Sequence, residues 1–347
     1  MIKDLKVEII KHKITIVLLV VFLFIGVIIG AFSVRLKNNI SSIFEPKAEH
    51  LNGYEGALTN PLLDCENYAN TGIVKLNPLK KEIEAIRKEA INEDKVSEMS
   101  IYYRNLRNGT WVGINLEAKF APASLLKVPV MIAYLKKAET DPSVLQKRIA
   151  ITDDSEMFEM TQEIKPTVYA RPGETYTVDE LINLMIANSD NIAKYGLTQE
   201  LEESSLDEVF IDLGLMLPEF SPEDDFMTVN EYATFFRILY NATYLNRAMS
   251  EKALEYLVKS EFDNGIRLGV PSNIVIANKF GERSFEDDQT GKLVHQLHDC
   301  GVVYFPESPY ILCIMTRGDS YDSMSAAIGD ISKQIYKYTA QSLSSEQ

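Results

Sequence analysis

One stretch decides the fold of this chain: Phe120-Ala121-Pro122-Ala123-Ser124-Leu125-Leu126-Lys127-Val128-Pro129. Its Ala-Pro-Ala turn leads into an apolar run that continues to Leu135. Ser124 and Lys127 are three residues apart, so a helix beginning here would place both side chains on one face, one turn apart. A hydroxyl beside an amine is a possible nucleophile with its general base. The stretch therefore predicts a catalytic pair at a helix start.

The residues after Ser124 predict a buried helix. The run from Val128 to Leu135 is too apolar for a surface helix, and Pro129 is tolerated only because it lies near the first turn. Burial would lower the pKa of Lys127, which suits a general base. The alternative is an ordinary helix start with Ser124 as the cap and Lys127 in solvent, since about one chance Ser-x-x-Lys is expected in a chain of this size.

Composition narrows the class of protein. Hydrophobic residues make up 46% of the 347 residues, which is ordinary for a globular protein and sufficient for a core. The formal net charge of −15 argues against a nucleic-acid partner. Three cysteines, Cys65, Cys300 and Cys313, do not make a disulfide framework. One pair could form, but three reduced thiols are favoured.

The N-terminal region predicts a membrane anchor. Ile14 to Val34 is an uncharged, mostly apolar run of 21 residues, long enough to span a bilayer core of about 30 Å as a transmembrane helix. More cations precede the run than follow it, which favours a cytoplasmic segment 1–13, an uncleaved anchor 14–34 and an extracytoplasmic body at the cell membrane. A cleaved signal peptide is the alternative, and either leaves the body outside the cytoplasm. Residues 35–77 resemble a stalk or linker in composition.

The body, residues 78–347, changes its pattern along the chain. A helix comes first, followed by a hairpin with Asn108-Gly109 at its turn. A mainly helical block occupies residues 136–260, where Thr177 with Glu180 and Thr228 with Glu231 predict two helix starts as capping boxes. Strands and a final helix follow. The fold class is therefore α/β of the α+β kind, with one antiparallel sheet built from the hairpin and three C-terminal strands, flanked by helices, and an inserted all-helical subdomain. The expected strands are Met99–Leu106, Thr110–Leu116, Ile274–Phe280, Gly301–Phe305 and Tyr310–Thr316, and the outer helices are Pro78–Asp94 and Met324–Thr339.

Two further motifs carry polar side chains. Ser189-Asp190-Asn191 follows an apolar helical stretch and offers a second hydroxyl and an amide, although such residues are also common at helix ends. Lys279-Phe280-Gly281 comes at the end of an expected strand, where a lysine can face a cleft. The alternative for Lys279 is an edge-strand lysine that discourages aggregation.

The three motifs in this order resemble the signature of class A β-lactamases and penicillin-binding proteins. The likeness runs from about Leu79 to Tyr338, and the expected order of helices and strands also fits that family. The resemblance implies a serine hydrolase that needs no metal or cofactor. It also implies a β-lactam substrate, or the D-Ala-D-Ala-like amide of a peptidoglycan stem peptide.

The resemblance implies a role for each matching residue. Ser124 would be the acylated nucleophile and Lys127 its base. Ser189 would pass a proton to the leaving nitrogen, Asn191 would bind the substrate amide, and Lys279 would attract a substrate carboxylate.

The same resemblance implies how the scissile carbonyl is held. The backbone N–H groups of Ser124 and Glu282 would form the oxyanion hole. Gly281 would let the substrate backbone lie close. The neighbouring cations Lys127 and Lys279 would each depress the pKa of the other.

Two departures from the family pattern stand out. The middle residue of the Lys-x-Gly motif is a hydroxyl in the family and Phe280 here, which cannot hydrogen-bond a carboxylate; Arg283 or Ser284 could compensate. The segment expected to carry the glutamate that activates the deacylating water is short and lacks the family's pattern. Glu219 and Glu223 are its candidate bases, and solvated loop acids are the alternative.

The sequence thus predicts a membrane-anchored, extracytoplasmic serine hydrolase that opens β-lactam amides through an acyl-enzyme on Ser124. The alternatives are a D-Ala-D-Ala peptidase of the penicillin-binding kind, or a non-catalytic binding protein of the same fold. His295 and His298 near Asp299 suggest a metal site or a histidine base, but no second ligand cluster at zinc spacing accompanies them, which favours ordinary polar residues. The oligomeric state is left open.

Overall fold

The computed structural model describes most of the body and little of the N-terminal region. The predicted anchor lies outside the described residues except for Gly26, and Glu219 and Glu223 lie outside them as well. None of the described helices is both long and apolar enough to cross a bilayer. The described residues are Gly26, 49–50, 57–63, 76–152, 162–217, 225–286 and 291–346.

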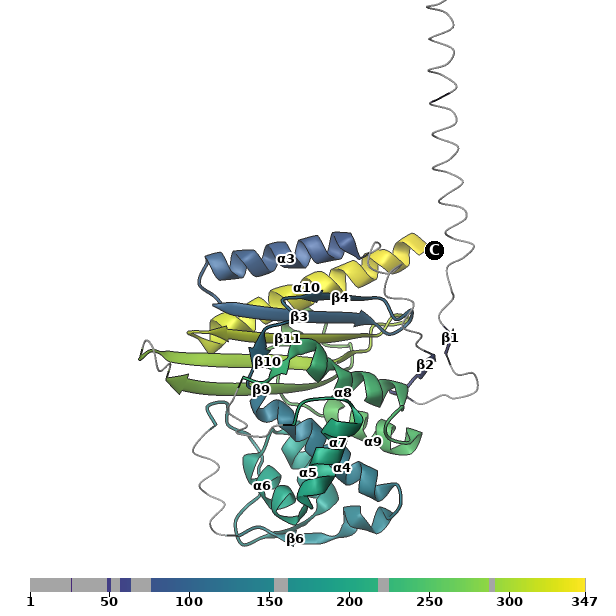
Figure 1. Cartoon of the computed structure of the whole chain (residues 1–347), viewed down its shortest axis with the longest axis vertical. Coiled ribbons are helices and arrows are strands. Elements are labelled where there is room, and N and C mark those ends of the chain that lie inside the picture. The colour runs from purple at the N-terminus through teal and green to yellow at the C-terminus, as the bar shows by residue number, and fades with distance from the viewer. Residues whose placement is uncertain are drawn as a thin grey trace, which may run out of the picture. The chain divides into compact units, whose positions relative to one another are not determined.

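A five-stranded antiparallel sheet joins the early hairpin to the late strands, as predicted (Figure 1). Its strand order is β4-β3-β11-β10-β9, so β4 and β9 are the edges. Strand β10 pairs with β9 on one side and with β11 on the other, and β11 pairs in turn with β3. The strands are β3 Glu98–Asn105, β4 Trp111–Ile114, β9 Ile276–Glu286, β10 Leu293–Val303 and β11 Tyr310–Gly318.

The last strands are longer than predicted. Strand β9 continues to Glu286, so Lys279 lies inside the strand rather than at its end. Strand β10 already begins at Leu293, and its first residues pair with the extension of β9 up to Glu286. These paired segments of β9 and β10 are mostly polar, so they lack the apolar alternation that would have predicted a strand. Backbone hydrogen bonds between the two strands hold these segments in extended conformation instead.

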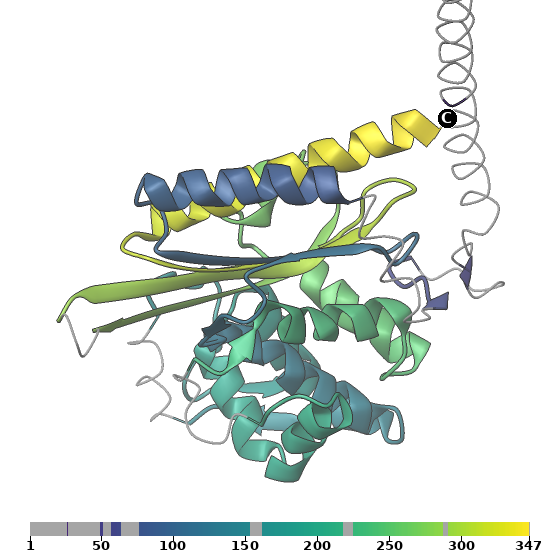
Figure 2. The same cartoon turned by 45° about the horizontal axis from the view of Figure 1, so that its top comes forward.

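Helices cover both faces of the sheet (Figures 1 and 2). Helices α3 and α10 pack on one face, and the predicted helical block packs on the other. Each face has its own apolar core, one with α3 and α10 and one with α4, α5, α8 and α9. The helices are α3 Asn77–Asn92, α4 Lys127–Ala138, α5 Val178–Ala187, α6 Asn191–Glu200, α7 Glu203–Asp212, α8 Val229–Asn241, α9 Arg247–Val258 and α10 Tyr321–Glu346.

Short elements complete the described chain. The 3₁₀ turn η2 precedes α4, and the small strands β5 and β8 pair beside it. The short helical turns are η2 Ala123–Leu126, η3 Pro142–Gln146 and η5 Ile266–Gly269; the short strands are β1 Glu49–His50, β2 Leu62–Leu63, β5 Lys119–Phe120, β6 Arg148–Ala150, β7 Thr175–Thr177 and β8 Met227–Thr228.

The predicted helix starts are confirmed at two positions. Thr177 caps α5, accepting from the Glu180 N–H while the Glu180 carboxylate accepts from the Thr177 N–H. Thr228 stands in the same relation to Glu231 at the start of α8. These reciprocal bonds satisfy N–H groups that a helix start otherwise leaves unpaired.

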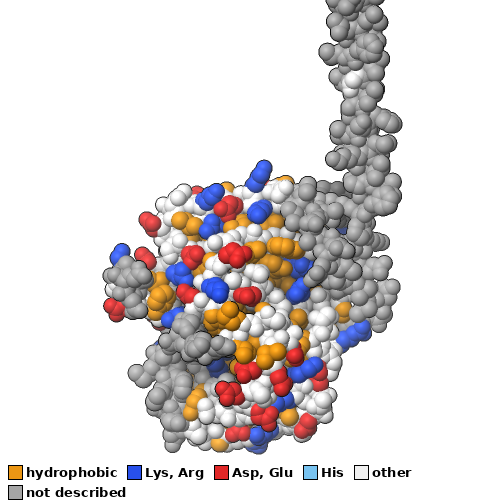
Figure 3. Space-filling model, viewed as in Figure 1, with side chains coloured by type: hydrophobic (Ala, Val, Ile, Leu, Met, Phe, Trp, Pro, Cys, Tyr) orange, Lys and Arg blue, Asp and Glu red, His pale blue; other side chains and the backbone are white. Residues whose placement is uncertain are grey.

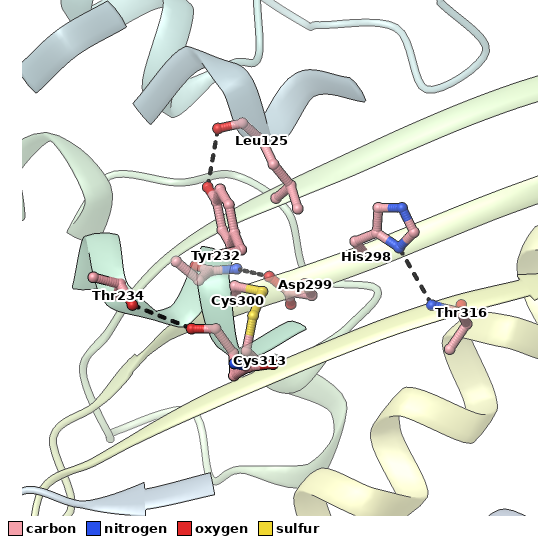
Figure 4. The surroundings of a disulfide bond; sticks show 10 residues. Leu125, Tyr232, Thr234, His298, Asp299, Cys300, Cys313 and Thr316 are labelled. Carbon is pink, nitrogen blue, oxygen red and sulfur yellow. Dashed lines mark hydrogen bonds between the residues drawn. A yellow bond between two sulfur atoms is a disulfide. The ribbon is translucent and has the colours of Figure 1, made fainter. Parts of the chain in front are cut away.

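A disulfide joins Cys300 on β10 to Cys313 on β11 (Figure 4). The expectation of three reduced thiols is therefore wrong for these two cysteines. The ladder sets them directly opposite each other, with their Cα atoms 4.0 Å apart, and both are fully buried. The register of two strands decides this pairing, and spacing along the chain does not reveal it.

Part of the predicted stalk docks on the body. The N–H groups of Leu58 and Thr59 donate to the Glu251 carboxylate on α9, at 2.7 and 3.0 Å. The Tyr304 hydroxyl donates to the Leu58 carbonyl, and the Asn60 N–H donates to the Tyr240 carbonyl. Segment 57–63 is therefore a strap held by polar contacts of its backbone.

The described surface has mixed charge. On the face shown in Figure 3, acidic and basic side chains are interspersed, with hydrophobic side chains between them. This face therefore offers no continuous basic patch of the kind that binds polyanions.

Candidate active site

The predicted pair lies together at the junction of η2 and α4. Ser124 is in η2, Lys127 is the first residue of α4, and the Lys127 Nζ donates to the Ser124 Oγ over 3.0 Å. Lys127 is fully buried, whereas Ser124 is partly exposed. The backbone of Ala123 is left-handed, with φ of 49°, which is uncommon for a residue other than glycine. Ser124 is thus partly open to solvent while its amine neighbour is kept from water.

Ser189, from the Ser189-Asp190-Asn191 motif, contacts Lys127 of the first motif. Its carbonyl and its Oγ both accept from the Lys127 Nζ, at 2.5 and 3.0 Å. The Lys279 Nζ also donates to the Ser189 Oγ, over 2.8 Å. Ser189 is fully buried and has φ of 59°. With two amines donating to its oxygen, this hydroxyl can direct its own proton toward a substrate.

Burial dominates the electrostatics of the two lysines. It lowers the pKa of Lys127 well below its usual value, and the nearby Lys279 and then Lys194 lower it further. Burial also lowers the pKa of Lys279 to about 7, and here Asp299 and Glu282 act in the opposite direction. The proximity of Lys279 thus lowers the pKa of Lys127, as predicted, but the expected reciprocal effect on Lys279 is not among the causes of its shift. Desolvation is the largest cause for both lysines.

Asp190 shapes the loop that carries Ser189. Its carboxylate caps α6 by accepting from the Ile192 N–H over 2.8 Å, and it also accepts from the Ala170 N–H over 2.7 Å. Burial raises the pKa of this carboxyl, partly offset by these hydrogen bonds. Asp190 therefore fixes the backbone between α5 and α6, which places Ser189.

Asn191 begins α6 and lines a pocket that does not include Ser124, Lys127, Ser189 or Lys279 among its lining residues. The pocket leaves room next to an amide side chain, and the contact of Asn191 with a substrate amide stays a prediction. Its other lining residues are Gln162, Lys165, Pro166, Tyr169, Asp190 and Ile192.

Gly281 serves a contact within the protein. A Cβ at this position would lie 2.7 Å from the Pro122 carbonyl oxygen and 2.9 Å from the Leu125 side chain. Glycine therefore lets β9 approach the turn that carries the serine. The predicted reason, room for a substrate backbone, is not what this geometry requires.

The Glu282 side chain has a role that the sequence did not suggest. Its carboxylate accepts from the N–H groups of Glu163 and Ile164, at 3.0 and 3.1 Å, and from the Tyr321 hydroxyl at 2.9 Å. It thereby ties the loop that carries Gln162 to the edge strand. The Gln162 amide in turn donates to the Ser189 carbonyl over 3.0 Å. No sequence signal links these residues, because the loop lies 118 or 119 positions away.

Side chains of strand β10 hydrogen-bond to the backbone of the turn that precedes Ser124. The Gln296 amide oxygen accepts from the Ala121 N–H over 3.0 Å, and the His298 Nε2 donates to the Ala121 carbonyl over 3.0 Å. The Tyr232 hydroxyl on α8 donates to the Leu125 carbonyl over 3.0 Å (Figure 4). These buried bonds fix the backbone on either side of Ser124.

The two candidate histidines have structural partners. Burial lowers the pKa of His298 to about 4, so this ring is neutral and supports the turn. The His295 Nδ1 lies 2.7 Å from the Ser284 hydroxyl. Within the described ranges, no group of three or more His, Cys, Asp or Glu side chains could hold a metal ion.

Phe280 packs into the protein. Its ring stacks on Phe262 with centroids 4.0 Å apart, and only 5% of the residue is exposed. The Lys279 Nζ lies 4.2 Å from the centre of the Phe280 ring. An aromatic face thus occupies the space beside the ammonium group.

A model of the Beta-lactamase enzyme family matches residues 78–339. The chain belongs to this family. The match covers the serine and lysine motifs and all five strands of the main sheet. It confirms the predicted relationship to serine hydrolases of the class A β-lactamase and penicillin-binding kind.

Relatives of this beta-lactamase family member support the assignment. The β-lactamase VEB-1 of Pseudomonas aeruginosa is 22% identical over 244 residues, which cover 65% of this chain and 80% of the relative. A class A β-lactamase from Mycobacterium abscessus has a similar fold, with a TM-score of 0.62, 18% identity, and coverage of 75% of this chain and 99% of its own. A PBP-A mutant, solved as an acyl-enzyme complex with penicillin G, gives 0.61 and 21%, with coverage of 75% and 96%.

Proposed function

We propose that this protein is a serine hydrolase that opens β-lactam amides through an acyl-enzyme on Ser124. One observation carries the proposal: the Lys127 Nζ lies 3.0 Å from both the Ser124 Oγ and the Ser189 Oγ. A buried amine with a lowered pKa can accept the Ser124 proton as the oxygen attacks.

The chemical steps follow from this contact. The Ser124 Oγ forms a bond to the carbonyl carbon while its proton passes to the Lys127 Nζ. The C–N bond then breaks, and the leaving nitrogen receives the Ser189 hydroxyl proton, which Lys127 replaces. Backbone N–H groups of Ser124 and Glu282 would stabilise the oxyanion. The proton count balances, and Lys127 returns to its neutral form.

Release of the acyl group has weaker support. The carboxylates of Asp190 and Glu282 are buried, and each accepts backbone hydrogen bonds that fix the surrounding loops. Neither is therefore free to activate water. The candidates Glu219 and Glu223 lie outside the described residues. A long-lived acyl-enzyme, as in a D-Ala-D-Ala peptidase of the penicillin-binding kind, is accordingly the second candidate.

Labelled penicillin G tests the proposal directly. Purified protein is incubated with an excess of the label, and intact mass and hydrolysis are followed together. A transient adduct with turnover supports a β-lactamase, and a lasting adduct on Ser124 supports the peptidase-like function. An absence of adduct in wild type, equal to that of Ser124→Ala, would contradict both.

We also propose that residues 14–34 anchor the body outside the cytoplasm. The uncharged run and the larger number of cations before it support this placement. Fractionation of expressing cells tests it. Intact protein in the soluble secreted fraction would contradict the anchor.

A further inference from the structure

The acylation site carries little excess positive charge on its Lys279 side. Lys279 is fully buried, and two of its N–H directions are used by the Ser189 Oγ at 2.8 Å and the Phe280 carbonyl at 3.0 Å. Two acidic side chains, Asp299 and Glu282, are near enough to raise its pKa. The lysine charge is thus largely balanced within the protein.

The residue after Lys279 lacks the hydroxyl donor that the family has at this position. Phe280 has no polar side-chain atom, and its ring lies against the ammonium and stacks on Phe262. With 5% exposure in a packed core, this ring cannot easily move aside. The position that carries a hydroxyl in the family therefore offers a ligand no hydrogen-bond donor here.

The two candidate substitutes for that donor have other contacts. The Ser284 hydroxyl donates to the Glu163 carboxylate over 2.6 Å and also contacts His295 and Tyr321. The Arg283 guanidinium lies over the Phe285 ring, 4.7 Å from its centre. The Ser284 proton is thus engaged within the protein, and the Arg283 guanidinium is held against an aromatic ring.

Glu282 adds a buried negative charge at the same edge. The residue is 8% exposed, and its carboxylate is held in place by Glu163, Ile164 and Tyr321. It raises the pKa of both Lys127 and Lys279, so its field reaches the acylation site. A second carboxylate brought beside Lys279 would be repelled by it and would lose its hydration.

We propose that the site prefers acyl donors that carry an uncharged group, such as an ester or a carboxamide, next to the scissile bond on the side facing Lys279. Acyl donors with a free carboxylate at this position should acylate Ser124 more slowly. This proposal rests on the proposed acylation of Ser124. It does not extend to the acyl side of the substrate, because Lys165 lines the pocket beside Asn191 and can accept an anionic group there.

A matched pair of compounds tests the preference: penicillin G and its methyl ester. Second-order rates of Ser124 acylation are measured by intact mass on the full chain. Because the carboxylate of the acid is repelled by Glu282 and loses its hydration at this site, the ester should acylate wild type at least about tenfold faster than the acid. The acid acylating as fast as the ester would overturn the preference while leaving the proposed function intact. If neither compound modifies wild type more than Ser124→Ala, both proposals fail.

Two variants assign the preference to its residues. Glu282→Gln keeps the shape and can accept from the same N–H groups while donating to the Tyr321 oxygen. It should raise the acid rate several-fold relative to the ester. Phe280→Thr restores a hydroxyl and should shift the ratio the same way, with thermal unfolding measured alongside because the Phe262 stack is lost. Glu286→Gln, at the exposed end of β9, is the control. A ratio unchanged in both variants would contradict the assignment.

Discussion

Lys127 and Lys279 donate to the same acceptor, the Ser189 hydroxyl oxygen, over 3.0 and 2.8 Å. Two buried amines around one oxygen cannot both hold a proton without a large cost in desolvation and repulsion. Lys127 has its pKa lowered by burial and by Lys279, while acidic neighbours favour the charged form of Lys279. The arrangement therefore favours Lys127 over Lys279 as the neutral, base-like amine.

Replacing Lys127 by alanine should lower the rate of Ser124 acylation by about 10²–10⁴-fold, because general-base assistance of that size is lost. Intact mass after mixing with penicillin methyl ester measures the rate. Lys137→Ala is the matched control, since Lys137 lies on the same helix and pairs with Glu202 at the surface. A Lys127→Ala rate within about a factor of ten of wild type would contradict the base role, since it falls below the lower bound of such assistance.

The stability of the protein should rise with pH between about 7 and 10. The pKa of Lys279 is about 7 in the folded protein against 10.5 for a free lysine side chain, so the unfolded chain binds more protons in this range. Unfolding therefore becomes less favourable as pH rises, by at most about 1.4 kcal/mol per pH unit for each such lysine. Urea unfolding across this range measures the slope. Lys279→Met should reduce it, and an undiminished slope would speak against the lowered pKa.

Reducing the Cys300–Cys313 disulfide should destabilise the fold. The bond closes a loop with a sequence separation of 13, for which the loss of constraint on the unfolded chain is worth about 3 kcal/mol. Urea unfolding with and without a thiol reductant measures the difference. The double variant Cys300→Ala, Cys313→Ala should be indifferent to reductant, whereas Cys65→Ser should behave as wild type. Equal stability of wild type under both conditions would argue against the bond.

The strap 57–63 should detach locally when Glu251 is replaced by alanine. Glu251 accepts from both backbone N–H groups of Leu58 and Thr59, and Thr59 is only 1% exposed. Hydrogen exchange of these two amides should speed up strongly, because exchange reports local opening. Glu255→Ala, on the exposed side of α9, should leave them protected. Unchanged protection in Glu251→Ala would show that other contacts hold the strap.

Much of the fold could be predicted from local patterns. The capping boxes at Thr177 and Thr228, the Asn108-Gly109 hairpin and the change to alternating apolar residues each indicate one element through its own backbone geometry. The outer halves of β9 and β10 could not be predicted this way. Their polar residues stay in strands because each pairs with the other, and that contact is not encoded in either segment alone.

The sequence by itself determined which residue types could form the acylation site, since Ser124 and Lys127 are set one helical turn apart by spacing alone. Tertiary structure decided their hydrogen-bond partners and the pKa values of the lysines. It brought Lys127 and Lys279 to the same Ser189 oxygen, buried both lysines, and tied Glu282 on β9 to the distant loop at Glu163. The physical reason is that desolvation, charge balance and cross-strand register depend on contacts between segments distant in sequence.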